Sequence, residues 1–191
     1  MFGIFRKTMT YEDYGYMSAD TMLSTLVEKP SQSAPEPIFN DTEGSIWKQP
    51  LTAITTSIHL DSEGVARQLA ILWLAFHQFC HIGLVSKDAG ERLLQGVMKR
   101  FDERFPNLSS DRTTVEATTA YMRAAAADIK NKSKSESFPT LVPLAIGRIT
   151  GLKPSDPHWP VVSDILYSLL EVILKTTEST LVGTKKHAKL V

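Results

Sequence analysis

The segment "DSEGVARQLAILWLAFHQFCHIG", residues 61–83, decides the fold that we expect for this chain. It opens with aspartate and serine side chains suited to capping a helix, and it closes with a glycine, which commonly follows a last helical turn. Between these ends, large apolar residues recur every three or four positions, which is the period of an α-helix. We predict a helix from about Glu63 to Ile82 with an apolar face wide enough for the centre of a protein.

Helical signals recur on both sides of this segment. The other expected helices are a short one starting at Ser18, an ambiguous one with apolar residues from Trp47 to Ile58, and four at 86–105, 112–130, 138–152 and 160–181. The stretch Pro30–Gly44 contains three prolines and no helical or strand period, which is typical of a linker or an extended arm. No segment shows a convincing strand pattern. We therefore predict an all-α fold, a single bundle of about five to seven helices with an extended N-terminal arm.

Length and composition fit this architecture. The chain has 191 residues, of which 42% are hydrophobic and 22% are charged. A chain of this length buries roughly 70% of its unfolded surface, so it needs no disulfide or structural metal for stability. We expect residues 1–44 to hold the short first helix and the proline-rich arm, and residues 45–191 to form the helical bundle domain.

The charge balance argues against nucleic acid as the partner. Lysine plus arginine and aspartate plus glutamate both number 21, so the formal net charge is zero, whereas a nucleic-acid binder usually carries a basic excess. The single cysteine excludes an internal disulfide and fits a reducing compartment. The N-terminal residues do not form a secretory signal. We therefore expect a cytoplasmic protein.

Two apolar segments are too short or too polar to be membrane spans. Residues 69–85 include two histidines and a glutamine, and residues 161–174 include two carboxylates, whereas a span needs about 20 predominantly apolar residues. We expect both segments to be core helices and expect no membrane span. The apolar face of the second segment covers more than half of its helix, so a homodimer is compatible with the sequence but not required by it.

His77 and His81 are the main candidates for a metal site. Their i, i+4 spacing on one helix is that of two imidazoles that bind zinc together, and a helical wheel places both on the polar strip of the helix while Cys80 turns toward the core. The stretch is His-Gln-Phe-Cys-His, and Gln78 cannot act as the general base that a glutamate supplies in the His-Glu-x-x-His motif of zinc peptidases. We favour a structural role, in which both histidines hydrogen-bond to a neighbouring helix or to water. Metal or haem ligation is the alternative.

The stretch "YEDYGYM", residues 11–17, is the main candidate for a binding surface. Tyr11, Tyr14 and Tyr16 precede the first expected helix, and aromatic residues at this density are over-represented in interfaces. Glu12 and Asp13 among them would attract a basic partner. The alternative, which we favour, is that these rings fold back onto the bundle, because aromatic rings near a chain end usually need cover.

Motifs for catalysis and cofactor binding are missing from the sequence. There is no phosphate-binding glycine loop, no Gly-x-Ser-x-Gly motif and no complete metal motif, so no cofactor is expected. Our leading hypothesis is a non-enzymatic helical protein–protein interaction module, that is an adaptor, inhibitor or regulatory subunit whose partner is another protein of unknown identity. The alternative is a helical metal- or haem-binding protein that uses His77 and His81, with or without enzymatic activity.

Overall fold

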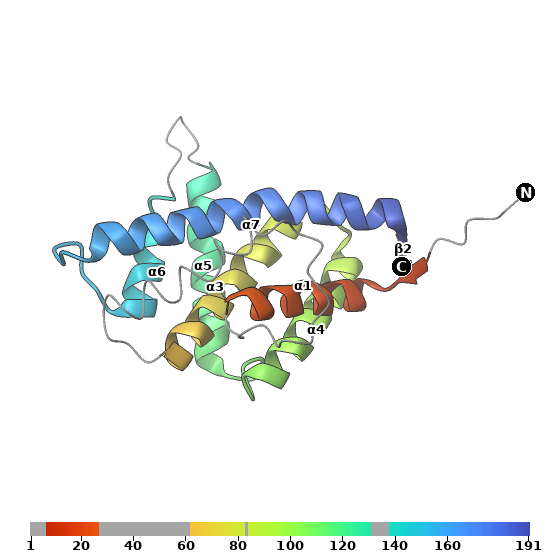
Figure 1. Ribbon diagram of the computed structural model, residues 1–191, viewed down its shortest axis with the longest axis horizontal. Coiled ribbons are helices and arrows are strands. Elements are labelled where there is room, and N and C mark those ends of the chain that lie inside the picture. The colour runs from red at the N-terminus through yellow and green to blue at the C-terminus, as the bar shows by residue number, and fades with distance from the viewer. Residues whose placement is uncertain (1–6, 27–61, 83, 131–137) are drawn as a thin grey trace, which may run out of the picture.

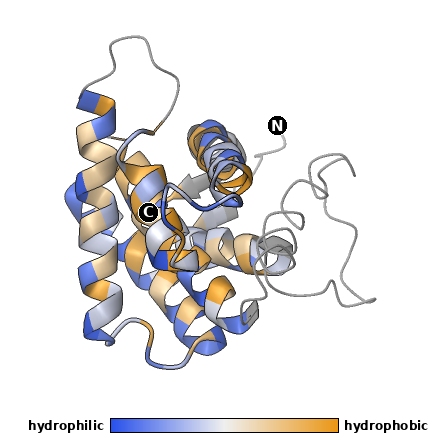
Figure 2. Ribbon diagram, turned by 90° about the vertical axis from the view of Figure 1, so that its left-hand side faces the viewer, coloured by the Kyte–Doolittle hydropathy of each residue, from blue (hydrophilic) through white to orange (hydrophobic). Residues whose placement is uncertain are grey.

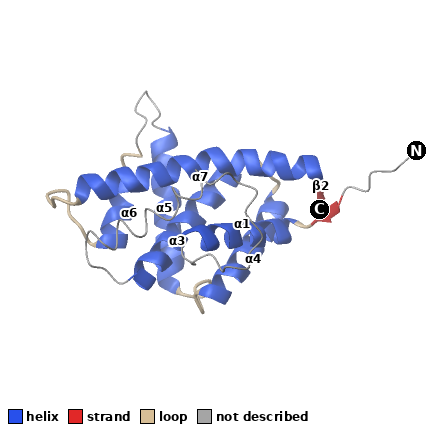
Figure 3. Ribbon diagram, in the orientation of Figure 1, coloured by secondary structure: helices blue, strands red, loops and turns tan. Residues whose placement is uncertain are grey.

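The computed structural model describes residues 7–26, 62–82, 84–130 and 138–191, and it confirms the all-α prediction. The elements of the described part are β1 (Lys7–Met9), α1 (Tyr11–Leu26), α3 (Ser62–His81), α4 (Lys87–Arg104), α5 (Arg112–Lys130), α6 (Leu141–Thr150), α7 (Trp159–His187) and β2 (Ala188–Leu190) (Figures 1 and 3). These helices fall within the predicted range of five to seven. The proline-rich arm at 30–44 and the helix predicted near 47–58 lie outside the described residues.

Helix α3 lies at the centre of the bundle, as its sequence predicts. Leu69, Leu72 and Phe76 are almost fully buried, and α4, α5, α6 and α7 all pack against this helix. A helix that is apolar on nearly every side is stable only when other elements cover it on every side. Hydrophobic and hydrophilic residues alternate along the ribbons in Figure 2, as expected for amphipathic helices around a shared core.

Several helix ends are set by identifiable caps. Ser86 caps α4, its Oγ accepting a first-turn N–H at 3.3 Å, and Gly151 ends α6 in the left-handed conformation with φ of 72°. Helix α6 is capped by a residue of the neighbouring helix α5. The buried Asp128 carboxylate of α5 accepts the N–H groups of Thr140 and Leu141, the latter at 2.8 Å. Amides in a first helical turn have no partner within their own helix, so Asp128 both caps α6 and ties it to α5.

Helix α7 is longer than predicted. It continues through Gly183 to His187, whereas we predicted an end at residue 181. Leu181 is buried, and the chain passes from α7 directly into β2. A glycine inside a helix costs only about 1 kcal/mol relative to alanine, so Gly183 does not have to end α7.

Strands β1 and β2 form a two-stranded parallel sheet that the sequence analysis did not predict. Thr8 lies opposite Lys189 in the register. Val191 continues the pairing, since its N–H donates to the Met9 carbonyl and its carbonyl accepts the Tyr11 N–H, both at 3.1 Å. The sheet joins the first and last described segments at one end of the bundle (Figure 1). Strands of three residues are too short to show a recognisable alternation of apolar and polar residues.

Helix α1 begins at Tyr11 and not at Ser18 as predicted. A capping box explains the earlier start. The Thr10 hydroxyl accepts the N–H of Asp13 at 3.0 Å, and the Asp13 carboxylate accepts the N–H of Thr10 at 3.3 Å. The tyrosine-rich stretch is therefore the first part of a helix and not a segment that precedes one.

Helices α1 and α4 meet backbone to backbone. A Cβ atom on Gly15 would lie 2.0 Å from the Leu93 carbonyl oxygen, and a Cβ atom on Gly96 would lie 1.9 Å from the Glu12 carbonyl oxygen. Because no side chain fits at either position, the two glycines set the separation of the helices. Through this contact α1 packs onto the bundle at its α4 side.

Candidate interaction surface on the first helix

The tyrosines of α1 lie in different surroundings. Tyr14 is 3% exposed, and its ring meets the His81 ring edge-on with the centroids 6.2 Å apart. Burial raises the pKa of the Tyr14 hydroxyl to about 12. The structure thus contradicts the exposure on which a partner-binding role for Tyr14 depended, and this ring belongs to the core. Tyr11 is half-buried and packs against the same core.

Tyr16 lies at the outer edge of the α1–α4 contact. Its hydroxyl donates to Glu103 Oε2 at 2.7 Å, and Lys99 Nζ lies 5.9 Å from the centroid of the ring. The hydrogen bond to Glu103 raises the pKa of Tyr16, so its hydroxyl is a donor at neutral pH. Side chains of α4 therefore hold this ring in place at the surface.

A shallow pocket lies where β1 meets α1. Its lining residues are Thr8, Met9, Asp13, Tyr16 and Met17, and its volume is about 280 Å³. We call these residues the Met17 surface, because Met17, at 54%, is among the most exposed large apolar side chains of the described residues and lies beside this pocket. The sequence analysis did not single out Thr8 and Met9, since their position beside α1 depends on the pairing of β1 with β2.

Carboxylates that form no ion pair with other described residues lie at the Met17 surface. Glu12 and Asp13 are exposed in the first turn of α1, and Glu103 accepts the Tyr16 hydroxyl on the neighbouring helix. No ion pair within the described residues includes any of these carboxylates. Lys99 lies over the Tyr16 ring on the α4 side, so the acidic border of the surface is the one that Glu12 and Asp13 form, and it attracts molecules of the opposite sign.

His77 and His81 lie inside the bundle and not on an exposed polar strip. Both are 3% exposed, and their ring centroids are 4.2 Å apart. His77 stacks on Trp73, and His81 Nδ1 hydrogen-bonds the His77 carbonyl at 2.8 Å. Burial and the neighbouring His81 lower the pKa of His77 well below its usual range. The helical wheel misplaced both rings because it shows one helix alone, whereas α3 is also covered on this side.

The two imidazoles form a partial set of metal ligands. No group of three or more histidine, cysteine or carboxylate side chains that could hold a metal ion occurs in the described ranges, whereas protein zinc sites use three or four protein ligands. Cys80 is half-buried and packs against the core, as the wheel indicated, and burial raises the pKa of its thiol to about 12. A thiol that stays protonated is a poor ligand and a poor nucleophile.

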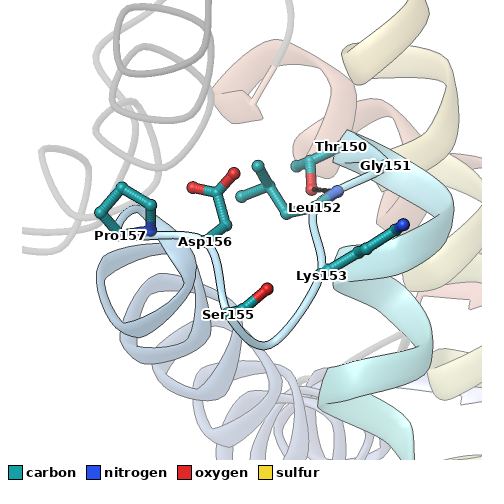
Figure 4. A pocket seen from close by; sticks show the side chains of 7 residues that line it. All are labelled: Thr150, Gly151, Leu152, Lys153, Ser155, Asp156 and Pro157. Atoms are coloured by element: carbon teal, nitrogen blue, oxygen red, sulfur yellow. Dashed lines mark hydrogen bonds between the residues drawn. The ribbon is translucent and has the colours of Figure 1, made fainter.

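A second pocket, of about 440 Å³, lies in the loop between α6 and α7 (Figure 4). It is lined by Thr150, Gly151, Leu152, Lys153, Ser155, Asp156 and Pro157. In the described part of the chain no hydrogen bond joins Ser155 to Lys153 or Asp156, and the Asp156 carboxylate accepts the His158 N–H at 2.9 Å. The pocket thus shows no contact between a nucleophile and a base of the kind that covalent catalysis uses.

Comparisons with known proteins give no family for this chain. No protein-family model, curated protein or solved structure matches it. Of the helices that the structure describes, none is long and apolar enough to cross a membrane. Function is therefore inferred from the chemistry of the Met17 surface and its bordering carboxylates.

Proposed function

We propose that this protein is a non-enzymatic interaction module that binds another protein through the Met17 surface. The observation that carries the proposal is the 54% exposure of Met17 beside a shallow pocket. A module of this kind acts as an adaptor, an inhibitor or a regulatory subunit.

The side chains of this surface are suited to solvent exposure in the free protein and to burial in a complex. Methionine is unbranched and polarizable, so Met17 and Met9 adapt to the shape of an incoming side chain. Tyr16 presents a large ring whose position is already fixed by Glu103, so little side-chain entropy is lost when a partner covers it.

The bordering carboxylates indicate a basic partner. Glu12 and Asp13 are on the exposed first turn of α1 and form no ion pair with other described residues. Attraction between opposite charges speeds association and weakens as salt screens it. The single cysteine fits a reducing compartment, so we propose that the encounter takes place in the cytoplasm.

Site-specific photo-crosslinking tests this proposal. A photoreactive phenylalanine analogue replaces Met17, and the matched control carries it at Val115, which is 55% exposed on α5. We expect discrete cross-linked products from position 17 and not from position 115, and we expect their yield to fall at high salt. Because exposure of the two positions is nearly equal, random collision would label both alike.

The same photoreactive phenylalanine analogue tests whether the Tyr16 and Met17 side chains are needed for partner binding. In a chain that carries the probe at Met9, the double change Tyr16→Ala and Met17→Ala should abolish the cross-linked product while the melting temperature stays nearly unchanged. Equal products from positions 17 and 115, or products that survive the double change, would show that the Met17 surface is not the binding surface.

A further inference from the structure

Strand β1 has one hydrogen-bonding edge that β2 does not use. The Met9 carbonyl and the Tyr11 N–H both bond to Val191, each at 3.1 Å, so these groups point toward β2. Backbone groups of successive strand residues point to opposite edges. The N–H and carbonyl of Thr8 therefore point away from β2, and no hydrogen bond of the described residues uses them.

This free edge borders the Met17 surface. Thr8 is exposed and lines the same pocket as Tyr16 and Met17. A strand laid beside Thr8 would run along the pocket, and every second side chain of that strand would face it. The exposed edge and the exposed apolar side chain are thus parts of one continuous surface.

We propose that the partner binds the Met17 surface as an extended segment that adds a third strand beside β1, with basic side chains next to apolar ones. This inference rests on the proposed function and specifies the partner's conformation and charge. Strand addition combines backbone hydrogen bonds, which hold the segment, with pockets for alternate side chains, which select it. The pocket of about 280 Å³ has room for a side chain of the added strand.

Charge distinguishes this occupant from a second copy of the chain. A second copy would bring the same acidic surface, with its exposed Glu12 and Asp13, to the interface, and surfaces of like charge repel. A lysine- or arginine-bearing segment meets these carboxylates with the opposite charge. Charge complementarity therefore favours a basic peptide.

The binding test uses a defined probe, the labelled peptide acetyl-Lys-Val-Lys-Val-Lys-amide, measured by fluorescence anisotropy against the full chain. The valines favour an extended backbone. Matched peptides carry either N-methyl groups on all backbone amides, which block strand pairing along both edges, or glutamates in place of lysines. We expect the lysine peptide to bind and both matched peptides to lose at least tenfold in affinity. An N-methylated peptide that binds as tightly as the parent would overturn strand addition.

The variant Thr8→Pro tests whether the Thr8 N–H of β1 binds the peptide. Proline lacks the N–H that points outward at this position, and edge strands accept proline where the missing N–H faces solvent. The pairing of β1 with β2 does not use this N–H, so the melting temperature should hold. The control Thr8→Val removes the hydroxyl and keeps the N–H. We expect Thr8→Pro to weaken binding of the lysine peptide about three- to tenfold relative to Thr8→Val, the usual effect of one hydrogen bond.

The outcomes separate this inference from the proposed function. Equal binding by the proline and valine variants, together with loss of binding in Met17→Ala, would overturn strand addition and leave the Met17 surface as the interface. Failure of the lysine peptide to bind at all would overturn the basic extended partner, while the cross-linking at position 17 decides the proposed function on its own. Self-association of the chain that Thr8→Pro abolishes would identify a second copy as the occupant and overturn the peptide proposal.

Discussion

The packing around α3 and the contact between α1 and α4 hold helices together by opposite means. Around α3, large side chains fill the space, as where the Phe76 ring meets the Phe138 ring at 90° with centroids 5.4 Å apart. Between α1 and α4, side chains are absent at the closest points and the backbones touch at Gly15 and Gly96. Removing atoms should therefore damage the first region, whereas adding atoms should damage the second.

The largest expected effect is the loss of a ring from the α3 core. Phe76→Ala should reduce the free energy of unfolding by about 3–5 kcal/mol, because it removes buried apolar surface and leaves a cavity. Phe79→Ala, at a half-buried position on the same helix, is the control and should cost clearly less. Urea denaturation of both variants measures the difference, and equal losses would show that α3 is not enclosed as described.

Adding one methyl group tests the α1–α4 contact. Gly96→Ala should cost about 1–3 kcal/mol, because its Cβ would overlap backbone atoms of α1 that cannot move independently. The same change at Gly147, where a Cβ would have no neighbour within 4 Å, should stabilise the protein by roughly 0.5–1 kcal/mol, since alanine favours a helix. The melting temperatures of the two variants should therefore shift in opposite directions from that of the unchanged protein. Shifts of the same sign would contradict a backbone contact at Gly96.

Acid should weaken the α3 core through His77. Its pKa in the folded protein is well below the ordinary value of 6.5, so the unfolded chain takes up a proton at a pH where the folded protein does not. Stability is then fully present above about pH 6.5 and falls by roughly 1.4 kcal/mol for each unit of pH below it, down to the pKa of the folded state. In His77→Phe, which keeps an aromatic ring against Trp73, this part of the slope should disappear. An unchanged acid slope would assign the loss to another group.

The smallest expected effects on stability are those of ion pairs, such as the one between Arg100 and Asp20, which flanks the α1–α4 contact. Arg100 Nε lies 2.7 Å from Asp20 Oδ1, and the arginine is largely buried, so a double-mutant cycle should give a coupling of about 0.5–1 kcal/mol. The exposed pair Arg112–Glu116 on α5 should give about 0.3–0.5 kcal/mol. Added salt should reduce the second coupling more than the first. A coupling near zero for Arg100 would show that this ion pair adds nothing to the contact between α1 and α4.

Sequence periodicity sufficed to predict the helices whose apolar faces are wide. The predicted range 112–130 matches α5, and the predicted range 86–105 matches α4 together with its two caps, Ser86 and Phe105. The predicted start of α1 was wrong because Ser18 was taken as the first residue of the helix and the capping pair Thr10–Asp13 was not considered. A helix end that depends on contacts elsewhere in the fold, such as the end of α7, leaves no local signal in the sequence.

The candidate site was only partly predictable for the same reason. The stretch at 11–17 drew attention to Tyr16 and Met17, but one of its rings, Tyr14, is in the core. Whether a tyrosine faces in or out depends on where α4 packs, and Gly96 decides that from a distant part of the chain. Thr8 joins the surface only because residues near 190 pair with β1, and no periodicity in either three-residue strand predicts such a pairing.

The parallel pairing of β1 and β2 also determines how the protein would respond to mechanical force. In a parallel pair, the start of β1 and the end of β2 lie at opposite ends of the sheet. Tension applied at those two points would run along the strands and load their cross-strand hydrogen bonds in shear, all at once. Shear resists force better than unzipping, in which the bonds break one after another. If a tethered partner were to pull on the outer ends of these strands, the smallest element of the fold would be the first to carry the load.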